Sequence, residues 1–261
     1  MNLSGDGPGR LPKQPASVTT FNPYQFEDLL TRSQDQYANA KYRIIAGYLQ
    51  GSERLRILNA GCGSGELSLI LSAAGHDVVG IDPASEYIEV ARRNAAEHGA
   101  SACAFEVSSI EAFEADRLFD CVVATDVLEH IEDDHRAIGK LATLVRPGGT
   151  VIVTVPAGQW LFGFHDEALG HFRRYSRADL RRLAERVLRV ESIRYFGFTL
   201  IPVCLLFSRV LRRPYPVAET GDSTKNPVTS AVLRALLRVD SVLPAPAGTS
   251  LILKGVSQGA R

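Results

Sequence analysis

Short apolar runs alternate with amphipathic segments along most of the chain from residue 55 onward. Each run has the length of a buried strand. Strands are expected at 55–60, 77–81, 102–107, 119–124, 150–155, 190–195 and 251–256. Apolar residues three and four apart predict helices at 24–49, 66–74, 85–98, 134–145, 176–188 and 229–243.

Strands that alternate with helices form a parallel sheet, because each crossover helix returns the chain to the same edge. Right-handed crossovers then place helices on both faces of the sheet. The predicted fold is therefore α/β: a doubly wound, Rossmann-like sheet of seven mostly parallel strands. A ligand is expected beyond the carboxyl ends of the strands, beside the first strand, where the strand order reverses.

Five segments are predicted along the chain. Residues 1–20 are polar and rich in Gly and Pro, and we expect a disordered tail. Residues 21–51 are expected to form an N-terminal helical lid, and residues 52–196 the ligand-binding core. Residues 197–247 are expected to form a helical insertion that serves acceptor recognition or an interface. Residues 248–261 are expected to form the final strand and a tail.

Composition and charge exclude several classes of protein. The 261 residues include 29 basic and 29 acidic ones, so the basic excess of a nucleic-acid binder is missing. The four cysteines form no CxxC pair, which excludes zinc knuckles and thioredoxin-like motifs. The first residues hold no apolar signal core, and the nearly apolar run 195–208 is shorter than the roughly 20 residues of a membrane span. A cytoplasmic protein is expected.

A glycine-rich turn follows the first strand, and an aspartate ends the second. Gly61, Gly63 and Gly65 allow a ligand to approach the backbone closely. Glu66 stands where a dinucleotide-binding turn has its third glycine, and its carboxylate would repel a pyrophosphate. Asp82, 21 residues after Gly61, suits a carboxylate that accepts hydrogen bonds from both ribose hydroxyls. S-adenosylmethionine, which has a ribose and no diphosphate, meets this description.

Four motifs in register resemble those of class I S-adenosylmethionine-dependent methyltransferases. They are residues 57–65, 80–83, 119–131 and 146–149. The third is similar to the type 11/12-like subgroup that includes the ubiquinone-biosynthesis O-methyltransferase. The resemblance covers roughly residues 55 to 156 and implies S-adenosylmethionine as the cofactor.

The resemblance also implies contacts to the cofactor. The glycine turn would line its amino-acid end, Asp82 would hold the ribose, and Ser109 and Ile110 would flank the adenine. Arg43 aligns with a basic residue that meets the cofactor carboxylate in the ubiquinone enzyme. The expected contacts are Arg43, Asn59, Gly61, Cys62, Gly63, Gly65, Asp82, Pro83, Ser109, Ile110 and Thr125.

Methyl transfer to a hydroxyl requires an aligned acceptor and a group that removes the proton. His130 follows the fourth strand, and histidine titrates near neutral pH, so we expect it to act as the base or to contact the acceptor. Asp126, Glu129 and His130 have i, i+3, i+4 spacing, which places them on one face of a helical turn. The ubiquinone enzyme carries a similar motif associated with a divalent ion, so the resemblance offers these residues as Mg²⁺ ligands instead. A third interpretation is that His130 only positions a loop.

A second group of polar residues follows the fifth strand. His165, Asp166 and His171 stand among aromatic residues and arginines. Such a segment suits a cover over a polar acceptor, with these three residues as contacts. The alternative is a connector whose aromatic residues enter the core and whose arginines are solvated.

Residues 196–213 are apolar at first and then basic, with Arg209, Arg212 and Arg213 near the end. Two interpretations stay open. The segment is either a helix buried against the sheet or in a homodimer contact, or an interfacial helix that makes peripheral contact with a membrane.

The function that these patterns favour is S-adenosylmethionine-dependent O-methylation of a hydroxyl on a small molecule, a glycan or a lipid-linked biosynthetic intermediate. One alternative is a quinol or phenol O-methyltransferase of the ubiquinone type, and another is an amino-sugar N-methyltransferase. A non-catalytic, cofactor-binding regulatory protein is the alternative from a different class.

Overall fold

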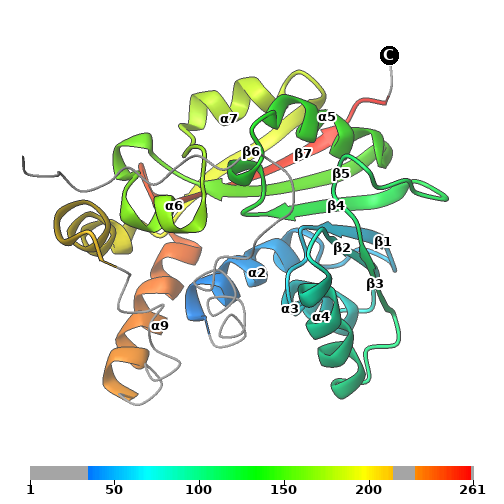
Figure 1. Cartoon of the computed structure of the whole chain (residues 1–261), viewed down its shortest axis with the longest axis horizontal. Helices are drawn as coiled ribbons and strands as arrows, with labels where there is room; N and C mark the ends of the chain where they lie inside the picture. Colours follow the sequence, from blue (N-terminus) through cyan, green and yellow to red (C-terminus); the bar gives the residue numbers. More distant parts are fainter. Residues whose placement is uncertain (1–34, 214–226, 260–261) are drawn as a thin grey trace, which may run out of the picture.

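The computed structural model describes residues 35–213 and 227–259, which form one sheet with helices on both faces (Figure 1). The strands lie in the order β3-β2-β1-β4-β5-β7-β6. Their bounds are β1 Arg56–Ala60, β2 Asp77–Asp82, β3 Cys103–Val107, β4 Phe119–Thr125, β5 Val145–Pro156, β6 Leu188–Phe196 and β7 Ser250–Ser257. Each expected strand is present, and β5 begins earlier than predicted.

The pairing confirms the predicted fold class. β1 pairs in parallel with β2 and β4, β2 with β3, and β4 with β5. β7 runs antiparallel to both β5 and β6, so β6 points in the same direction as the first five strands. The order reverses between β1 and β4, and the carboxyl ends of these two strands therefore meet in the middle of the sheet.

The main helices are α2 Gln36–Tyr48, α3 Glu66–Ala73, α4 Ser85–Glu97, α5 Asp134–Thr143, α7 Arg177–Ala184 and α9 Pro227–Val242. α5 and α7 cover one face of the sheet, whereas α2, α3, α4 and α9 lie on the other (Figure 1). Side chains alternate across each strand, so neighbouring residues enter different cores. On β1, Leu58 packs in the core shared with α5 and α7, and Ile57 in the core shared with α2, α3 and α9.

Helix ends follow the sequence signals closely. Ser176 caps α7, because its side chain accepts a hydrogen bond from the Asp179 N–H. Gly99, with φ of 62°, follows the end of α4. The expected helix 24–49 is represented by α2. Its first part and the expected tail 1–20 lie outside the described residues.

Several short helices were not predicted from the sequence. Before α7 these are the 3-10 helices η2 Leu128–His130 and η3 Gln159–Leu161 and the short helix α6 Phe164–Leu169. After β6 the chain forms η4 Phe198–Leu200, α8 Ile201–Cys204 and the π-helical segment η5 Leu205–Leu211. The apolar run 195–208 is therefore divided between the end of β6 and this surface segment.

Candidate active site

The glycine turn after β1 has a backbone that favours glycine. The φ angles of Gly61, Gly63 and Gly65 are 70°, 54° and 89°. A Cβ on Gly61 would clash with the side chain of Val127, which follows β4. The turn therefore packs against the segment after β4, and the ends of β1 and β4 contribute to one site.

Asp82 ends β2 beside this turn and is buried. One carboxylate oxygen accepts the Gly63 N–H at 3.1 Å, and the other accepts the Ala84 N–H at 3.0 Å. These two backbone hydrogen bonds fix the orientation of the carboxylate. The carboxylate is thus held at the carboxyl end of β2, next to the glycine turn.

Asn59, the next-to-last residue of β1, is only 1% exposed. Its amide donates to Ser68 Oγ at 3.0 Å, while its Oδ1 has no hydrogen-bond partner among the described residues. A buried acceptor without a donor is uncommon in a native protein. S-adenosylmethionine carries an ammonium group that can donate directly or through a water, so the turn and this oxygen fit the expected cofactor.

The other expected cofactor contacts differ in exposure. Cys62, Ile110 and Thr125 are buried, Ser109 is half-buried and Pro83 is exposed. Burial raises the pKa of the Cys62 thiol well above its usual range. This thiol is therefore an apolar filler of the turn and does not act as a nucleophile.

α2 brings a different basic residue to the site from the one expected. Arg43 is exposed, whereas Lys41 is only 4% exposed and forms an ion pair with Asp126, just after β4. Lys41 belongs to the buried stripe of α2, beside Ala38 and Tyr42. The sequence signal for this residue is a lysine at a core position of an amphipathic helix, and the contacts expected from the sequence do not include it.

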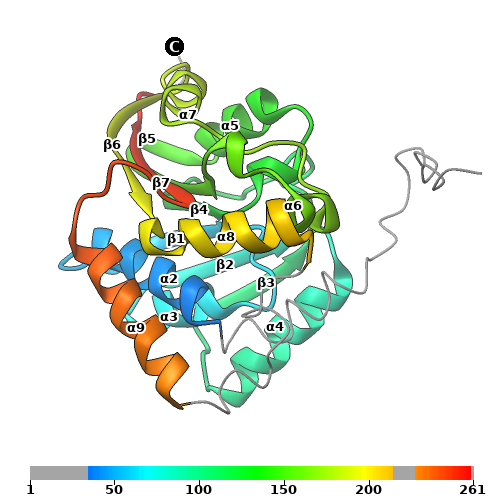
Figure 2. The same cartoon turned by 90° about the vertical axis from the view of Figure 1, so that its left-hand side faces the viewer.

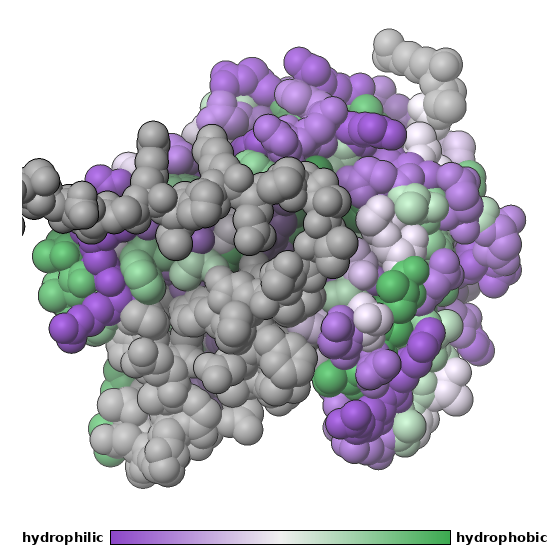
Figure 3. Space-filling model, viewed as in Figure 1, coloured by the Kyte–Doolittle hydropathy of each residue, from purple (hydrophilic) through white to green (hydrophobic). Residues whose placement is uncertain are grey.

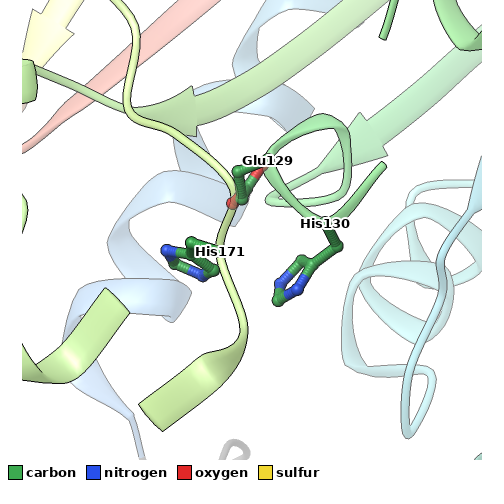
Figure 4. A group of neighbouring side chains, drawn as sticks. All are labelled: Glu129, His130 and His171. Atoms are coloured by element: carbon green, nitrogen blue, oxygen red, sulfur yellow. The ribbon is translucent and has the colours of Figure 1, made fainter. Parts of the chain in front are cut away.

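Three titratable side chains from two segments of the chain meet beyond β4 (Figure 4). Glu129 and His130 lie on η2, and His171 follows α6. One nitrogen or oxygen atom from each side chain lies within 4.8 Å of the other two. The two imidazole rings meet edge to face, with their centroids 4.6 Å apart. We call these three residues the acceptor cluster.

Asp166 orients one of these histidines. It is fully buried, and its Oδ1 accepts hydrogen bonds from His171 Nδ1 at 2.9 Å and Arg174 Nε at 2.7 Å. Burial raises the pKa of Asp166, but the His171 hydrogen bond and the Arg174 charge outweigh it and lower the pKa to about 2. An ionised carboxylate only accepts, so Nδ1 of His171 carries the proton and Nε2 of the neutral ring keeps its lone pair. Asp166 is therefore a positioning residue, which corrects its expected contact with the acceptor.

Glu129 is fully buried, and neither of its carboxyl oxygens has a hydrogen-bond partner among the described residues. Burial raises the pKa of Glu129 well above its usual range, and the negative charge of Asp126 raises it further. The neutral acid is favoured, and it offers one O–H donor to the acceptor cluster.

Asp126 does not join the acceptor cluster, which corrects the set expected from i, i+3, i+4 spacing. Its φ of 54° lies in the left-handed region, and η2 is a 3-10 turn, so the chain does not follow an α-helix here. The Asp126 carboxylate pairs with Lys41 and accepts a hydrogen bond from Thr154 Oγ1 at 3.0 Å.

The donor set of the acceptor cluster does not fit Mg²⁺. This ion prefers oxygen ligands in octahedral geometry. The cluster offers two imidazoles and one carboxyl group, and the neighbouring Asp126 carboxylate is held by Lys41. Imidazoles beside a carboxyl group are better suited to accepting and donating protons.

His165 lies apart from the acceptor cluster. It is half-buried on α6, and its backbone N–H donates to Ser208 Oγ at 3.3 Å. Of the three residues expected after β5, only His171 thus belongs to the cluster. Asp166 is hydrogen-bonded to His171, and His165 lies on α6 beside Asp166.

Residues 30–187 match the family described as a methyltransferase domain. The chain belongs to the class I S-adenosylmethionine-dependent methyltransferases. It is 38% identical over 150 residues to the ubiquinone biosynthesis O-methyltransferase of Methylocella silvestris, a match that covers 56% of this chain and 55% of the relative. A protein of the same name from Rhizobium etli is 39% identical over 101 residues, which are 39% of this chain and 41% of the relative. The matches thus span about half the length of these curated relatives.

Solved structures resemble the fold of this methyltransferase over most of its length. The N-methyltransferase NodS from Bradyrhizobium japonicum, in complex with S-adenosyl-L-homocysteine, has a TM-score of 0.59 at 15% identity and covers 91% of this chain and 99% of that one. The [4+2]-cyclase SpnF has a TM-score of 0.61 at 17% identity, with coverages of 89% and 94%. At such low identity these likenesses show the fold alone.

In this methyltransferase the glycine turn and the acceptor cluster adjoin. Gly61 packs against Val127, and Val127 lies two residues before Glu129. A backbone hydrogen bond joins the two segments of the acceptor cluster: the Phe172 N–H donates to the Glu129 carbonyl at 2.8 Å.

Proposed function

We propose that this methyltransferase transfers a methyl group to a hydroxyl of a small molecule, a glycan or a lipid-linked intermediate, with His171 as the proton acceptor. The observation that carries the proposal is the Asp166–His171 hydrogen bond of 2.9 Å in a cluster that adjoins the cofactor turn. A hydroxyl must lose its proton on transfer, and this pair presents a histidine nitrogen with a free lone pair.

When bound, S-adenosylmethionine supplies an electrophilic methyl group on a sulfonium, whose leaving group needs no acid. The chain's own residues then have two tasks. Asp82 and the turn from Gly61 to Gly65 hold the cofactor at the ends of β1 and β2. His171 takes the proton of the acceptor hydroxyl, while His130, which is exposed beside it, contacts the acceptor.

A quinol or phenol is the second candidate acceptor. The relatives of this chain support this candidate. They are named ubiquinone biosynthesis O-methyltransferases and are 33–39% identical to this chain over part of their length. The acceptor cluster itself does not distinguish an aromatic hydroxyl from a sugar hydroxyl, because both lose a proton to the same base.

The test is methyl transfer from labelled S-adenosylmethionine into fractions of host extract, with sugars, phenols and membrane lipids tried in parallel. Label in a hydroxyl of a sugar or lipid supports the first candidate, and label in a phenol fraction supports the second. Label on an amine would overturn O-methylation. Cofactor binding without transfer to any fraction would leave only a regulatory role.

Asp82→Ala is expected to weaken the binding of S-adenosylhomocysteine by about 2 kcal/mol, or roughly 30-fold, because a hydrogen bond to a charged group contributes about 1.5–3 kcal/mol. Calorimetry measures the affinity, and a melting curve confirms that the fold is kept. Asp77→Ala is the matched control. Asp77 lies at the other end of β2 in an exposed ion pair with Arg54, and its replacement should leave the affinity unchanged.

Turnover is expected to persist in excess chelator and to gain nothing from added Mg²⁺. The reason is the donor set: two imidazoles and one carboxyl group are poor partners for this ion, and Lys41 holds the Asp126 carboxylate. Initial rates after dialysis against chelator, with and without Mg²⁺, provide the measurement. Loss of activity that Mg²⁺ restores would contradict the proposed base and favour a metal-dependent enzyme.

A further inference from the structure

α9 carries an apolar stripe on its outward side. The helix turns Leu237 and Asp240 inward, where both are buried. The opposite side repeats large apolar residues at intervals of three and four, which places them on one face. These exposed residues are Val228, Val232, Leu236, Val239 and Val242, followed by Leu243.

The segment from η4 to η5 exposes a second set of apolar side chains. Within α8 and η5 only Ser208 is buried. Phe198, Leu206, Val210 and Leu211 are all at least 45% exposed, and Val210 reaches 71%. Of the interpretations left open for residues 196–213, burial against the sheet does not account for these exposed apolar side chains, which need another explanation.

Both sets lie on the same side of the molecule. Figure 2 shows α8 and α9 together on the side that faces the viewer. Figure 3 shows apolar side chains along the left-hand edge, where α8 and η5 lie in Figure 1. The Thr199 Oγ1 donates to Asp240 at 2.7 Å, which joins η4 to α9. We call the exposed apolar side chains of η4, η5 and α9 the outer face.

The exposed charges within the ranges 198–213 and 227–243, which carry the outer face, have one sign. Asp240 is the one acidic residue of the ranges 198–213 and 227–243, and it is buried. Arginines accompany the apolar residues within or just after both helical segments: Arg209, Arg212, Arg213, Arg234 and Arg238. Arg212 forms an ion pair with Glu167 of α6, and the other four arginines are exposed, with no ion pair to another described residue.

We propose that the outer face docks this methyltransferase on an anionic lipid surface. Exposed apolar residues on helices with basic residues beside them bind at the boundary of headgroups and acyl chains, and anionic lipid strengthens the contact. The inference rests on the proposed function only in that docking would bring the active site to a lipid-linked acceptor. Among the described residues no helix is long and apolar enough to cross a bilayer.

A second copy of the chain is the competing occupant. In a two-fold dimer the same patch faces itself. The arginines of one copy would then oppose those of the other, with no exposed acidic residue from η4, η5 or α9 to pair with them. Anionic headgroups neutralise the same arginines, which favours lipid over self-association.

The test is flotation of the full chain with vesicles of phosphatidylcholine alone or mixed with phosphatidylglycerol, without acceptor or cofactor. Binding to the mixed vesicles is expected, and high salt should weaken it. The double variant Arg234→Ala, Arg238→Ala should bind roughly 30-fold more weakly. Val232→Asp with Val239→Asp should abolish flotation. Leu118→Asp, a change at a 48% exposed leucine outside the outer face, is the matched control and should float normally.

Equal flotation of all these variants, or none with mixed vesicles, would overturn the proposal. So would a dimer in sedimentation that dissociates in the Val232→Asp, Val239→Asp variant, because the outer face would then be a contact between copies. Methyl transfer to a water-soluble acceptor is measured separately. Failure of vesicle binding would therefore contradict only the docking proposal and not the proposed function. Loss of methyl transfer would contradict only the proposed function and not docking on a lipid surface.

Discussion

Replacing His171 with alanine is expected to lower the rate of methyl transfer by about 10²–10⁴-fold, the range typical of a lost general base. Asp166 fixes the protonated Nδ1 of this ring, so the opposite nitrogen is the proton acceptor that the variant removes. Affinity for S-adenosylhomocysteine should be unchanged, because His171 lies on the acceptor side. Single-turnover rates with saturating cofactor provide the measurement, and calorimetry checks the cofactor side.

His135→Ala is the matched control for this experiment. His135 is exposed on α5, outside the acceptor cluster, and its loss should leave the rate unchanged. His130→Ala should reduce the rate less than His171→Ala, because His130 is proposed to contact the acceptor whereas His171, oriented by Asp166, is proposed to take its proton. A larger loss in His130→Ala would transfer the role of base to His130, and a near-normal rate in His171→Ala would contradict the assignment.

The sheet could be predicted because its signals are local. Each strand is a short apolar run, and Gly61 and Asp82 mark the ends of the first two strands. Strand order follows from the alternation with helices and the usual handedness of crossovers. β5 extends further than predicted because Val145 already pairs with Phe119, while the Pro-Gly-Gly turn that follows gives no strand signal.

The acceptor cluster could be predicted only in part, since its members are distant in the sequence. His130 and His171 were both candidates, but nothing in the sequence indicates that they touch. The expected grouping with Asp126 assumed α-helical spacing, whereas a left-handed residue and a 3-10 turn follow β4. Helix α6, which positions Asp166, has six residues and is too short to show a periodic pattern.

Arg174 and Asp166 are expected to contribute most to the stability of the acceptor side. Both side chains are buried, and the Arg174 Nε lies 2.7 Å from Asp166 Oδ1. Arg174→Met should lower the free energy of unfolding by about 3–5 kcal/mol, because the variant leaves a buried carboxylate without its main countercharge. Urea denaturation measures the loss. Arg182→Met is the control: its ion pair with Asp179 is exposed, so the change should be about 1 kcal/mol or less.

The pH dependence of unfolding tests the same pair independently. The pKa of Asp166 is about 2 in the folded protein, below the ordinary value of 3.8, so the ionised form stabilises the fold. This contribution, about 2 kcal/mol, is complete above pH 3.8 and is lost as the pH falls toward 2. In Arg174→Met the folded pKa rises because the countercharge is gone, so less stability should be lost over that interval. If both proteins lose the same stability between pH 4 and pH 2, Arg174 is not what holds the Asp166 carboxylate ionised, and the orientation of His171 must depend on other contacts.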